Sequence, residues 1–431
     1  MRHPATPPRR AVLAAGAAGL VLALTATPLT HAAHHPEPPT NGSLVLVGGG
    51  LKADNTAVYG EIIKRAGGPG ARIGVITAAS VPASQDPHAD DPRLCSNSAC
   101  NGAYYADLFK QHGAADAQWI PIDLDHIAAA DSGEVVARIA GMTGFFFGGG
   151  DQYRYITTLL NGERHTDSKA LAAIRAKLAS GAVVAGSSAG AQIAAGRDMV
   201  TGGDSYRGLR DGSTPGYFDD PARLGYLPAG GFGFLTSGLI DTHTGAYGRE
   251  GRALRLAADT GHDRVYGLQE NTALIVDRPG TATEHITVRG DNGVTIIDLR
   301  RARTQTTPQG WSLHGARYHH LTDGDRYSAH TWTIHPGAGK RRLHALGWTP
   351  VPANADVFHS ADHPEGHAYS LLGTARALAA TRAQRTATAT THETAPRFTV
   401  TLTKAGPYAT WTTDGRTPAT ITGLDISVAA R

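Results

Sequence analysis

The first half of the chain alternates short apolar runs with longer stretches in which apolar residues recur at helical spacing. Apolar runs predict strands over 44–47, 72–76, 118–122 and 144–147, and a further strand follows Gly181. Helical spacing predicts helices over 55–66, 103–112, 134–140 and 168–180. Regular alternation of strands and helices favours an α/β fold, with a mainly parallel sheet covered by helices on both faces.

The pattern changes beyond about residue 277, where polar and apolar residues alternate one by one. This alternation predicts strands over 286–288, 294–299, 327–334, 398–403 and 419–428, with one helix over 370–382. We therefore expect an α/β domain over 43–302, preceded by a linker over 34–42 and followed by a β-rich C-terminal region over 303–431.

The N-terminal segment has the pattern of an export signal. Arg9 and Arg10 precede an apolar run over 11–26, which leads to the small residues Ala32 and Ala33. The run is too short and too rich in Gly and Ala for a membrane anchor. We expect residues 1–33 to be a signal peptide and the mature protein to be secreted, with no membrane association. The paired arginines fit the twin-arginine route, although an ordinary basic region has the same pattern.

Composition and charge narrow the class of protein further. The chain has 41% hydrophobic and 18% charged residues, as globular proteins do, and its net charge of +3 is too small to favour nucleic acid or a membrane surface as partner. Its two cysteines, Cys95 and Cys100, lie close together in a polar segment. In an exported protein such a pair predicts a structural disulfide, whereas a metal site would need further ligands.

Glycine-rich turns follow three of the predicted strands. Gly48–Gly50 and Gly148–Gly150 end two of them, and Gly186–Gly190 has the pattern Gly-x-Ser-x-Gly between a strand and an Ala-rich helical segment. In a nucleophile elbow this pattern lifts the serine hydroxyl above the sheet, which makes Ser188 a candidate nucleophile. The alternative is an inert or phosphate-binding turn. Ligand sites of parallel sheets lie at the carboxyl ends of the strands, where these turns are expected.

Other candidate site residues lie on either side of this turn. His243 follows an apolar segment over 234–240, so it is either a general base or a histidine at a strand end. The run 148–152 is either a cradle of backbone amides or a plain tight turn. Arg249, Arg252 and Arg255 recur at every third position, so they share one helix face. That face would suit substrate carboxylates, or it is a solvated cationic surface.

A metal site is the other chemistry to consider. His359, His363 and His367 recur at every fourth position, as ligands on one helix face do. Pro364 and Gly366 interrupt such a helix, so surface histidines are the preferred interpretation. We expect no metal and no other cofactor.

Taken together, four segments resemble the cyanophycinase and dipeptidase E family of serine peptidases. These are 148–152 (GGGDQ), 186–191 (GSSAGA), 241–243 (DTH) and 267–274 (GLQENTAL), and the resemblance covers roughly residues 44–300. It implies an α/β core like that of glutamine amidotransferases, and chemistry by serine and histidine without a metal. Members of this family often pair as dimers, so the resemblance leaves a homodimer open for this chain.

The resemblance implies a role for each candidate residue. Ser188 would be the nucleophile and His243 the base, and the amides of Gly149, Gly150 and Ala189 would form the oxyanion hole. Gln152 and Asp241 would lie at the substrate pocket. The three arginines, Arg249, Arg252 and Arg255, would bind substrate carboxylates.

Two points depart from the family pattern or stay open. Thr242 and Thr244 flank the histidine where the family has glutamine and an aromatic residue, and the arginine spacing is longer by one residue, which puts the register of Arg249 in doubt. The acid that orients His243 is expected to be Asp204, after the elbow, with Glu270 as the alternative.

The resemblance also implies a substrate. It is cyanophycin, a polymer with an aspartate backbone that carries arginines on its β-carboxyl groups, or a related aspartyl peptide, and the products would be β-aspartyl-arginine dipeptides. One alternative is an esterase of the α/β-hydrolase type, but its order of serine, acid and late histidine fits poorly here. The other is a secreted binding protein without activity.

Overall fold

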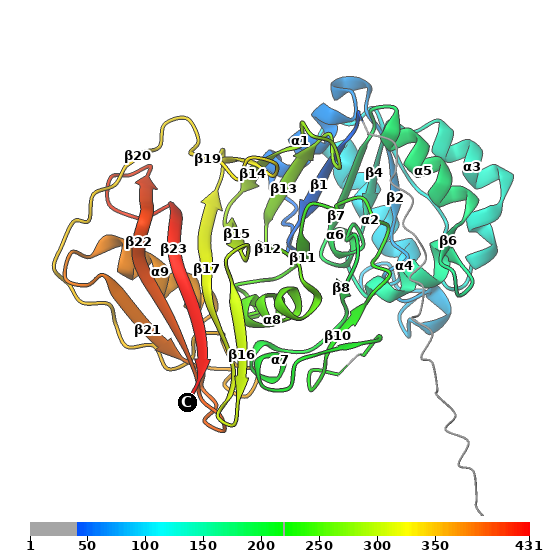
Figure 1. Ribbon diagram of the computed structural model, residues 1–431. Helices are drawn as coiled ribbons and strands as arrows, with labels where there is room; N and C mark the ends of the chain where they lie inside the picture. The colour runs from blue at the N-terminus through cyan, green and yellow to red at the C-terminus, as the bar shows by residue number, and fades with distance from the viewer. Residues whose placement is uncertain (1–40, 219) are drawn as a thin grey trace, which may run out of the picture. The chain divides into compact units, whose positions relative to one another are not determined.

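The computed structural model describes residues 41–218 and 220–431, which belong to one compact unit (Figure 1). The signal peptide predicted over 1–33 lies outside the described residues. Its outcome stays a prediction. In the part of the chain that the structure describes, no helix has both the length and the apolar character needed to cross a membrane.

The first of two large sheets contains the predicted parallel strands. Its order is β19-β18-β14-β13-β1-β7-β4-β2-β3, and the five strands from β1 to β3 in this order are parallel to one another. These five are β1 (Ser43–Val47), β7 (Val183–Ser187), β4 (Gly144–Phe147), β2 (Arg72–Ile76) and β3 (Asp116–Trp119). The antiparallel remainder is β13 (Thr272–Asp277), β14 (His285–Gly290), β18 (Arg326–Ser328) and β19 (Ile334–His335).

Helices cover both faces of this parallel half. Val45 and Val47 of β1 belong to one core cluster with apolar residues of α1 (Thr56–Arg65) and α2 (Ser98–Gln111). Leu44 and Leu46, which point to the opposite face, pack with α3 (Gly133–Ala140), α4 (Gln152–Leu159) and α5 (Lys169–Ala179). The predicted α/β class, with helices on both faces, is confirmed.

The second large sheet holds most of the C-terminal region. Its order is β11-β12-β15-β17-β23-β22-β20, with β16 beside β17 and β21 beside β22. The bounds are β11 (Leu239–Asp241), β12 (Arg264–Leu268), β15 (Gly293–Asp298), β16 (Arg303–Thr307), β17 (Gly310–Thr322), β20 (Arg341–Arg342), β21 (Thr386–Thr390), β22 (Phe398–Thr412) and β23 (Thr420–Ala430). The predicted β-rich C-terminal region is therefore present. Because β15 pairs with β17, this sheet runs across the boundary predicted at residue 302.

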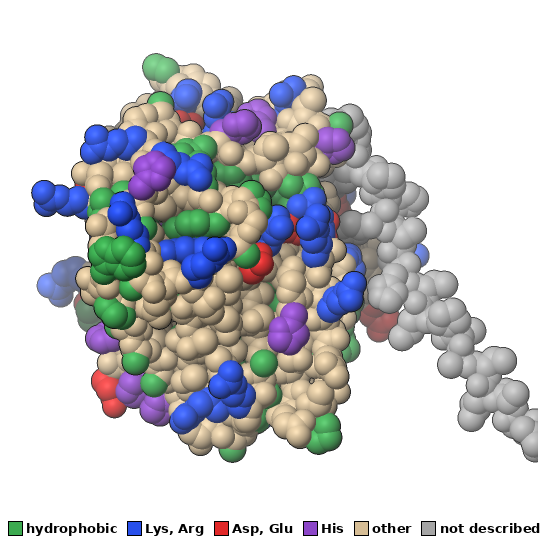
Figure 2. All heavy atoms as spheres, turned by 60° about the vertical axis from the view of Figure 1, so that its left-hand side comes forward, with side chains coloured by type: hydrophobic (Ala, Val, Ile, Leu, Met, Phe, Trp, Pro, Cys, Tyr) green, Lys and Arg blue, Asp and Glu red, His purple; other side chains and the backbone are tan. Residues whose placement is uncertain are grey.

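The second sheet packs on both of its faces. Tyr266 and Leu321 share a core cluster with the first sheet, whereas Val265 and Leu313 pack with α7 (Ser205–Asp211), α8 (Glu250–Thr260) and α9 (Ser370–Ala380). In Figure 2, basic and histidine side chains on one face of the molecule lie scattered among uncharged groups, with few acidic ones.

The remaining elements are short. They are α6 (Ala189–Gln192), β5 (Leu160–Asn161), β6 (Thr166–Asp167), β8 (Met199–Val200), β9 (Ser213–Pro215), β10 (Leu224–Leu227) and three 3₁₀ turns, Gly68–Gly70, Ala83–Gln85 and Ile127–Asp131. Two predicted strands are shorter than expected. The segment 327–334 is a hairpin of β18 and β19, and 234–240 contributes only to β11.

The predicted disulfide is confirmed: Cys95 and Cys100 are joined at the start of α2. Between them lies Asn97, whose side chain accepts a hydrogen bond from the backbone amide of Cys100 at 3.0 Å and caps the helix. The bridge therefore closes a small loop around the N-terminus of this helix.

Candidate active site

Ser188 lies at the carboxyl end of β7, between the parallel strands β1 and β4. Its φ of 56° and ψ of −117° place it in a strained conformation between β7 and the short helix α6. Gly186 and Gly190 allow this tight turn, because a Cβ atom on either would come within 2.1 Å of a backbone oxygen. The elbow predicted from Gly-x-Ser-x-Gly is therefore formed. The neighbouring strands β1 and β4 bring Gly48–Gly50 and Gly148–Gly150 to its two sides.

His243 and Glu270 reach the serine from the second sheet. They follow β11 and β12, which are adjacent and parallel, so both side chains emerge at the same edge. Nε2 of His243 lies 2.7 Å from Oγ of Ser188, and Nδ1 lies 2.7 Å from Oε1 of Glu270. The three residues form one continuous hydrogen-bonded chain of the kind that activates a serine nucleophile.

The structure corrects the expectation for the orienting acid. Asp204 caps α7: its carboxylate accepts a hydrogen bond from the amide of Arg207 at 2.7 Å and forms an ion pair with that arginine's side chain. It makes no contact with His243. Glu270, the alternative, holds that position because the strand it follows lies directly beside the strand that leads to the histidine.

The electrostatic environment keeps His243 in the form that a base requires. Burial lowers the pKa of the imidazole, the nearby Arg249 guanidinium lowers it further, and hydrogen bonding to Glu270 opposes both effects. The side chain is only 12% exposed. The net effect is a pKa below the usual histidine value, so the imidazole is neutral at neutral pH and can accept the serine proton.

The three amides expected to form an oxyanion hole lie beside Ser188. A Cβ atom on Gly149 would lie 3.3 Å from the Cβ atom of Ser188, and Gly150 has a φ of 136° that favours glycine. Ala189 begins α6, where backbone amides have no partner within the helix. No described residue accepts a hydrogen bond from these three amides. They can therefore donate to a developing oxyanion.

A cavity of about 480 Å³ opens in front of this chain of residues. Ser188, His243 and Gln152 line it, and Nε2 of Gln152 donates a hydrogen bond to the carbonyl of Val200 at 3.2 Å. The charged residues of its lining are Asp151, Arg154, Asp220, Arg249 and Arg252. The cavity therefore presents groups of both signs to a bound molecule.

The three arginines of the predicted cationic face have different surroundings. Arg252 is buried and forms a bidentate pair with Asp241, with N–O distances of 2.8 Å and 2.7 Å. Arg255 pairs with Asp259 at 2.8 Å and does not line the cavity. Asp241 and Arg252 therefore satisfy each other beneath the cavity, and Arg255 is engaged elsewhere.

Of the three arginines, Arg249 is the one that lines the cavity and is not paired with a carboxylate of the described residues. Its guanidinium donates to the carbonyl of Thr242 at 3.2 Å, and among the described residues it has no ion pair with a carboxylate. Burial, with a smaller effect of Arg252, lowers its pKa to about 10, so it stays protonated at neutral pH. Arg249 can therefore bind a substrate carboxylate.

Sequence reasoning missed Tyr247. Its ring stacks on the His243 imidazole, with ring centroids 4.8 Å apart and an angle of 6° between the planes. The Arg249 guanidinium lies 4.9 Å from the centroid of the same ring, in a cation–π contact. Tyr247 is 56% exposed and lines the cavity. The available signal was an aromatic residue four positions after the histidine in a glycine-rich segment.

The histidines considered as metal ligands do not come together. Nδ1 of His363 bonds to Asp356, whereas Nδ1 of His359 bonds to the carbonyl of Ala246. Within residues 41–218 and 220–431, no three His, Cys, Asp or Glu side chains are arranged to hold a metal ion.

Sequence comparison relates part of this chain to known peptidases. Residues 96–283 match the sequence profile of peptidase family S51. The cyanophycinase of Nostoc sp. (strain PCC 7120 / SAG 25.82 / UTEX 2576) is 27% identical over 307 residues, which cover 69% of this chain and 90% of that protein. The cyanophycinase of Thermosynechococcus vestitus (strain NIES-2133 / IAM M-273 / BP-1) is 28% identical over 302 residues, which cover 68% and 81%.

Among solved structures, a peptidase from an acI-B1 Actinobacterium is similar to this chain. It has 21% sequence identity and a TM-score of 0.44, over 67% of this chain and 96% of that one.

Proposed function

We propose that this chain is a serine-type peptidase that hydrolyses cyanophycin, or a related aspartyl peptide, to β-aspartyl-arginine dipeptides. The match of residues 96–283 to peptidase family S51 and the similarity to cyanophycinases support this proposal. The observation that carries this proposal is the hydrogen-bonded chain from Ser188 through His243 to Glu270 at the edge of a charged cavity.

The mechanism follows from the positions of these groups. Oγ of Ser188 attacks the substrate carbonyl carbon while Nε2 of His243 takes its proton, and the amides of Gly149, Gly150 and Ala189 stabilise the resulting oxyanion. The tetrahedral intermediate collapses, the C–N bond breaks and His243 returns the proton to the leaving amine. His243 then takes a proton from a water molecule, whose oxygen attacks the acyl carbon. The ester C–O bond breaks, the acid product leaves, and His243 returns the proton to Oγ of Ser188. Glu270 holds the imidazole in the required tautomer and stabilises its protonated form.

The charges of the cavity support a substrate that carries both signs. Arg249 can bind a carboxylate, as described above. Asp151 and Asp220 also line the cavity, and among the described residues neither forms an ion pair with a basic side chain. An aspartyl peptide with arginine side chains would place its carboxylate near Arg249 and a guanidinium near these acids.

We further propose that the mature chain acts outside the cell. Two features support export: the basic, apolar and small-residue pattern of residues 1–33, and a disulfide, which persists in oxidising compartments. Mass measurement of the protein recovered from the culture medium would test this. A mature N-terminus near residue 34 is expected, and retention of the intact chain inside the cell would contradict it.

The activity is tested by incubating the mature protein with purified cyanophycin and following soluble products by mass. We expect β-aspartyl-arginine from the wild type and none above background from Ser188→Ala. Ser187→Ala is the matched control, because this neighbouring serine ends β7 and does not contact His243. Full activity of folded Ser188→Ala would overturn the mechanism. If the wild type forms an acyl-enzyme but releases no β-aspartyl-arginine from cyanophycin, its substrate is not cyanophycin, and other aspartyl peptides should be tested.

A further inference from the structure

The loop that carries His243 has an unusual backbone. His243, Gly245 and Gly248 all have left-handed φ angles, of 53°, 56° and 58°. Two of these three residues are glycine, which has the greatest backbone freedom in the unfolded chain. Such a segment does not hold one conformation by itself, so contacts from elsewhere must fix it.

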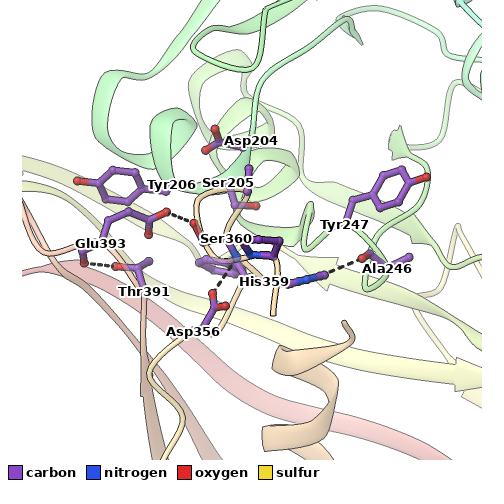
Figure 3. Close-up of a pocket in the computed structure, with 13 residues that line it drawn as sticks. Asp204, Ser205, Tyr206, Ala246, Tyr247, Asp356, His359, Ser360, Thr391 and Glu393 are labelled. Carbon is purple, nitrogen blue, oxygen red and sulfur yellow. Dashed lines mark hydrogen bonds between the residues drawn. The ribbon is translucent and has the colours of Figure 1, made fainter. Parts of the chain in front are cut away.

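Several of those contacts come from the segment 356–369 of the C-terminal region. The amide of Tyr369 donates to the carbonyl of Gly245 at 2.6 Å, and Nδ1 of His359 lies 3.1 Å from the carbonyl oxygen of Ala246. Figure 3 shows this second contact beside Tyr247. Two consecutive carbonyl groups of the loop, two and three residues after the catalytic histidine, are thus bound by this segment.

The same segment packs directly against both glycines. A Cβ atom on Gly245 would lie 2.3 Å from the Tyr369 ring, and one on Gly248 would lie 1.5 Å from the carbonyl oxygen of Phe358. Neither position has room for any side chain while the segment is in place. The loop and the segment are therefore fitted to each other.

The segment also reaches the acid of the catalytic chain. Nδ2 of Asn292 donates to the backbone carbonyl of Glu270 at 2.8 Å and lies 3.5 Å from the hydroxyl of Tyr369. The segment also forms one wall of a second cavity of about 350 Å³, shown in Figure 3. Tyr247 lines both cavities.

We propose that residues 356–369 position the active site: they hold the loop 243–248 so that the Tyr247 ring and the His243 imidazole stay stacked in register with Ser188. The inference rests on the proposed function only in taking Ser188 as the nucleophile. It assigns a role to a part of the C-terminal region that lies outside the family match over 96–283.

The contact of His359 is the one to change, because it is the hydrogen bond to the loop for which the segment supplies a side chain. His359→Ala removes the hydrogen bond to Ala246. His359→Asn should restore it, since the asparagine amide can replace Nδ1 and asparagine tolerates the φ of 47° at this position. His367→Ala is the matched control: this histidine lies in the same segment, is exposed, and makes no described contact with the loop.

Two readouts apply to the full-length mature protein. The first is the rate at which phenylmethylsulfonyl fluoride modifies Ser188, followed by mass. We expect about a tenfold lower rate for His359→Ala, wild-type rates within about twofold for His359→Asn and His367→Ala, and unchanged thermal unfolding for all. The pH below which the rate of Ser188 modification falls should also be higher in His359→Ala. The reason is that a His243 imidazole that is held less firmly is more exposed to water, which opposes the lowering of its pKa by burial.

The second readout does not depend on activity. The NMR titration of His243, identified by its absence in His243→Gln, should shift in His359→Ala and not in His367→Ala. Wild-type labelling and an unchanged titration in His359→Ala would overturn the inference, as would an equal loss in His367→Ala. If the folded wild type is not modified by phenylmethylsulfonyl fluoride, Ser188 is not the nucleophile. The NMR titration of His243 would then still decide whether residues 356–369 position the loop.

Discussion

Gly49 lies against the edge of the His243 imidazole. A Cβ atom on Gly49 would lie 2.1 Å from Cε1 and 2.2 Å from Nε2 of that ring, and its φ of 102° also favours glycine. The amide of His243 donates to the carbonyl of the neighbouring Gly48 at 2.7 Å. The first glycine-rich turn thus packs against the proposed catalytic base, His243, next to the serine that follows β7.

The first prediction is that Gly49→Ala loses most activity without unfolding the protein. The new methyl group would push the imidazole away from Oγ of Ser188, and a displacement of about 1 Å can cost roughly 100-fold in rate. Steady-state kinetics with a chromogenic ester would measure this. Gly60→Ala in α1 is the control, because a Cβ atom there meets nothing within 4 Å, and it should stabilise the helix by about 0.5–1 kcal/mol. If Gly49→Ala keeps the kcat of the wild type, the His243 imidazole can move away from Gly49 without loss of rate, which would contradict this prediction.

The second prediction separates the two candidate acids. Glu270→Gln should lower kcat by roughly 10³-fold, because the amide no longer stabilises the protonated imidazole or fixes its tautomer. Asp204→Asn should keep kcat within about twofold, since an asparagine still caps α7. Pre-steady-state burst kinetics would show whether the loss of kcat in Glu270→Gln lies in the acylation step, as we expect. Equal losses in both variants would contradict the assignment of Glu270.

Much of the framework of this site could be predicted from sequence. The glycine-rich turns after β1, β4 and β7 mark strand ends in the sequence, and in a parallel sheet such ends lie at the same edge. Ser188 and His243 followed from the elbow and from the apolar segment before the histidine. These predictions depend on local pattern and on the rules of parallel sheets.

The orienting acid and the arginine roles could not be predicted in the same way. The position of Glu270 depends on the pairing of β11 with β12, which are separated by α8 and belong to the second sheet. Spacing placed three arginines on one helix face, but their partners Asp241 and Asp259 decide which charge is available. The contacts of 356–369 with 245–248 join segments more than a hundred residues apart, and no local pattern reveals them.

The third prediction concerns the pH dependence of activity. Because burial and Arg249 lower the pKa of His243, and the neutral imidazole is the base, activity should be present above that pKa and lost as the pH falls through it. The acid limb of kcat/KM should therefore have its midpoint below 6.5, the ordinary histidine value. Arg249→Gln removes one of the two lowering effects, so its midpoint should move to higher pH. If the midpoint in Arg249→Gln equals that of the wild type, Arg249 does not lower the pKa of His243.

The fourth prediction concerns Glu250, which follows Arg249 and begins α8. Its carboxylate accepts a hydrogen bond from the amide of Gly245 at 3.0 Å, and burial raises its pKa to about 7 from 4.5. Between these pH values the folded chain binds more protons than the unfolded chain, so the free energy of unfolding should fall as the pH rises, and the fall should end above pH 7.

Glu250→Gln tests this directly, because glutamine cannot ionise and still offers an oxygen to the Gly245 amide. Its Tm should equal that of the wild type near pH 4.5 and exceed it increasingly up to pH 8. Glu163→Gln, at an exposed position, is the control and should show no such divergence. If the two Tm curves of wild type and Glu250→Gln run parallel across this range, Glu250 does not carry the buried proton.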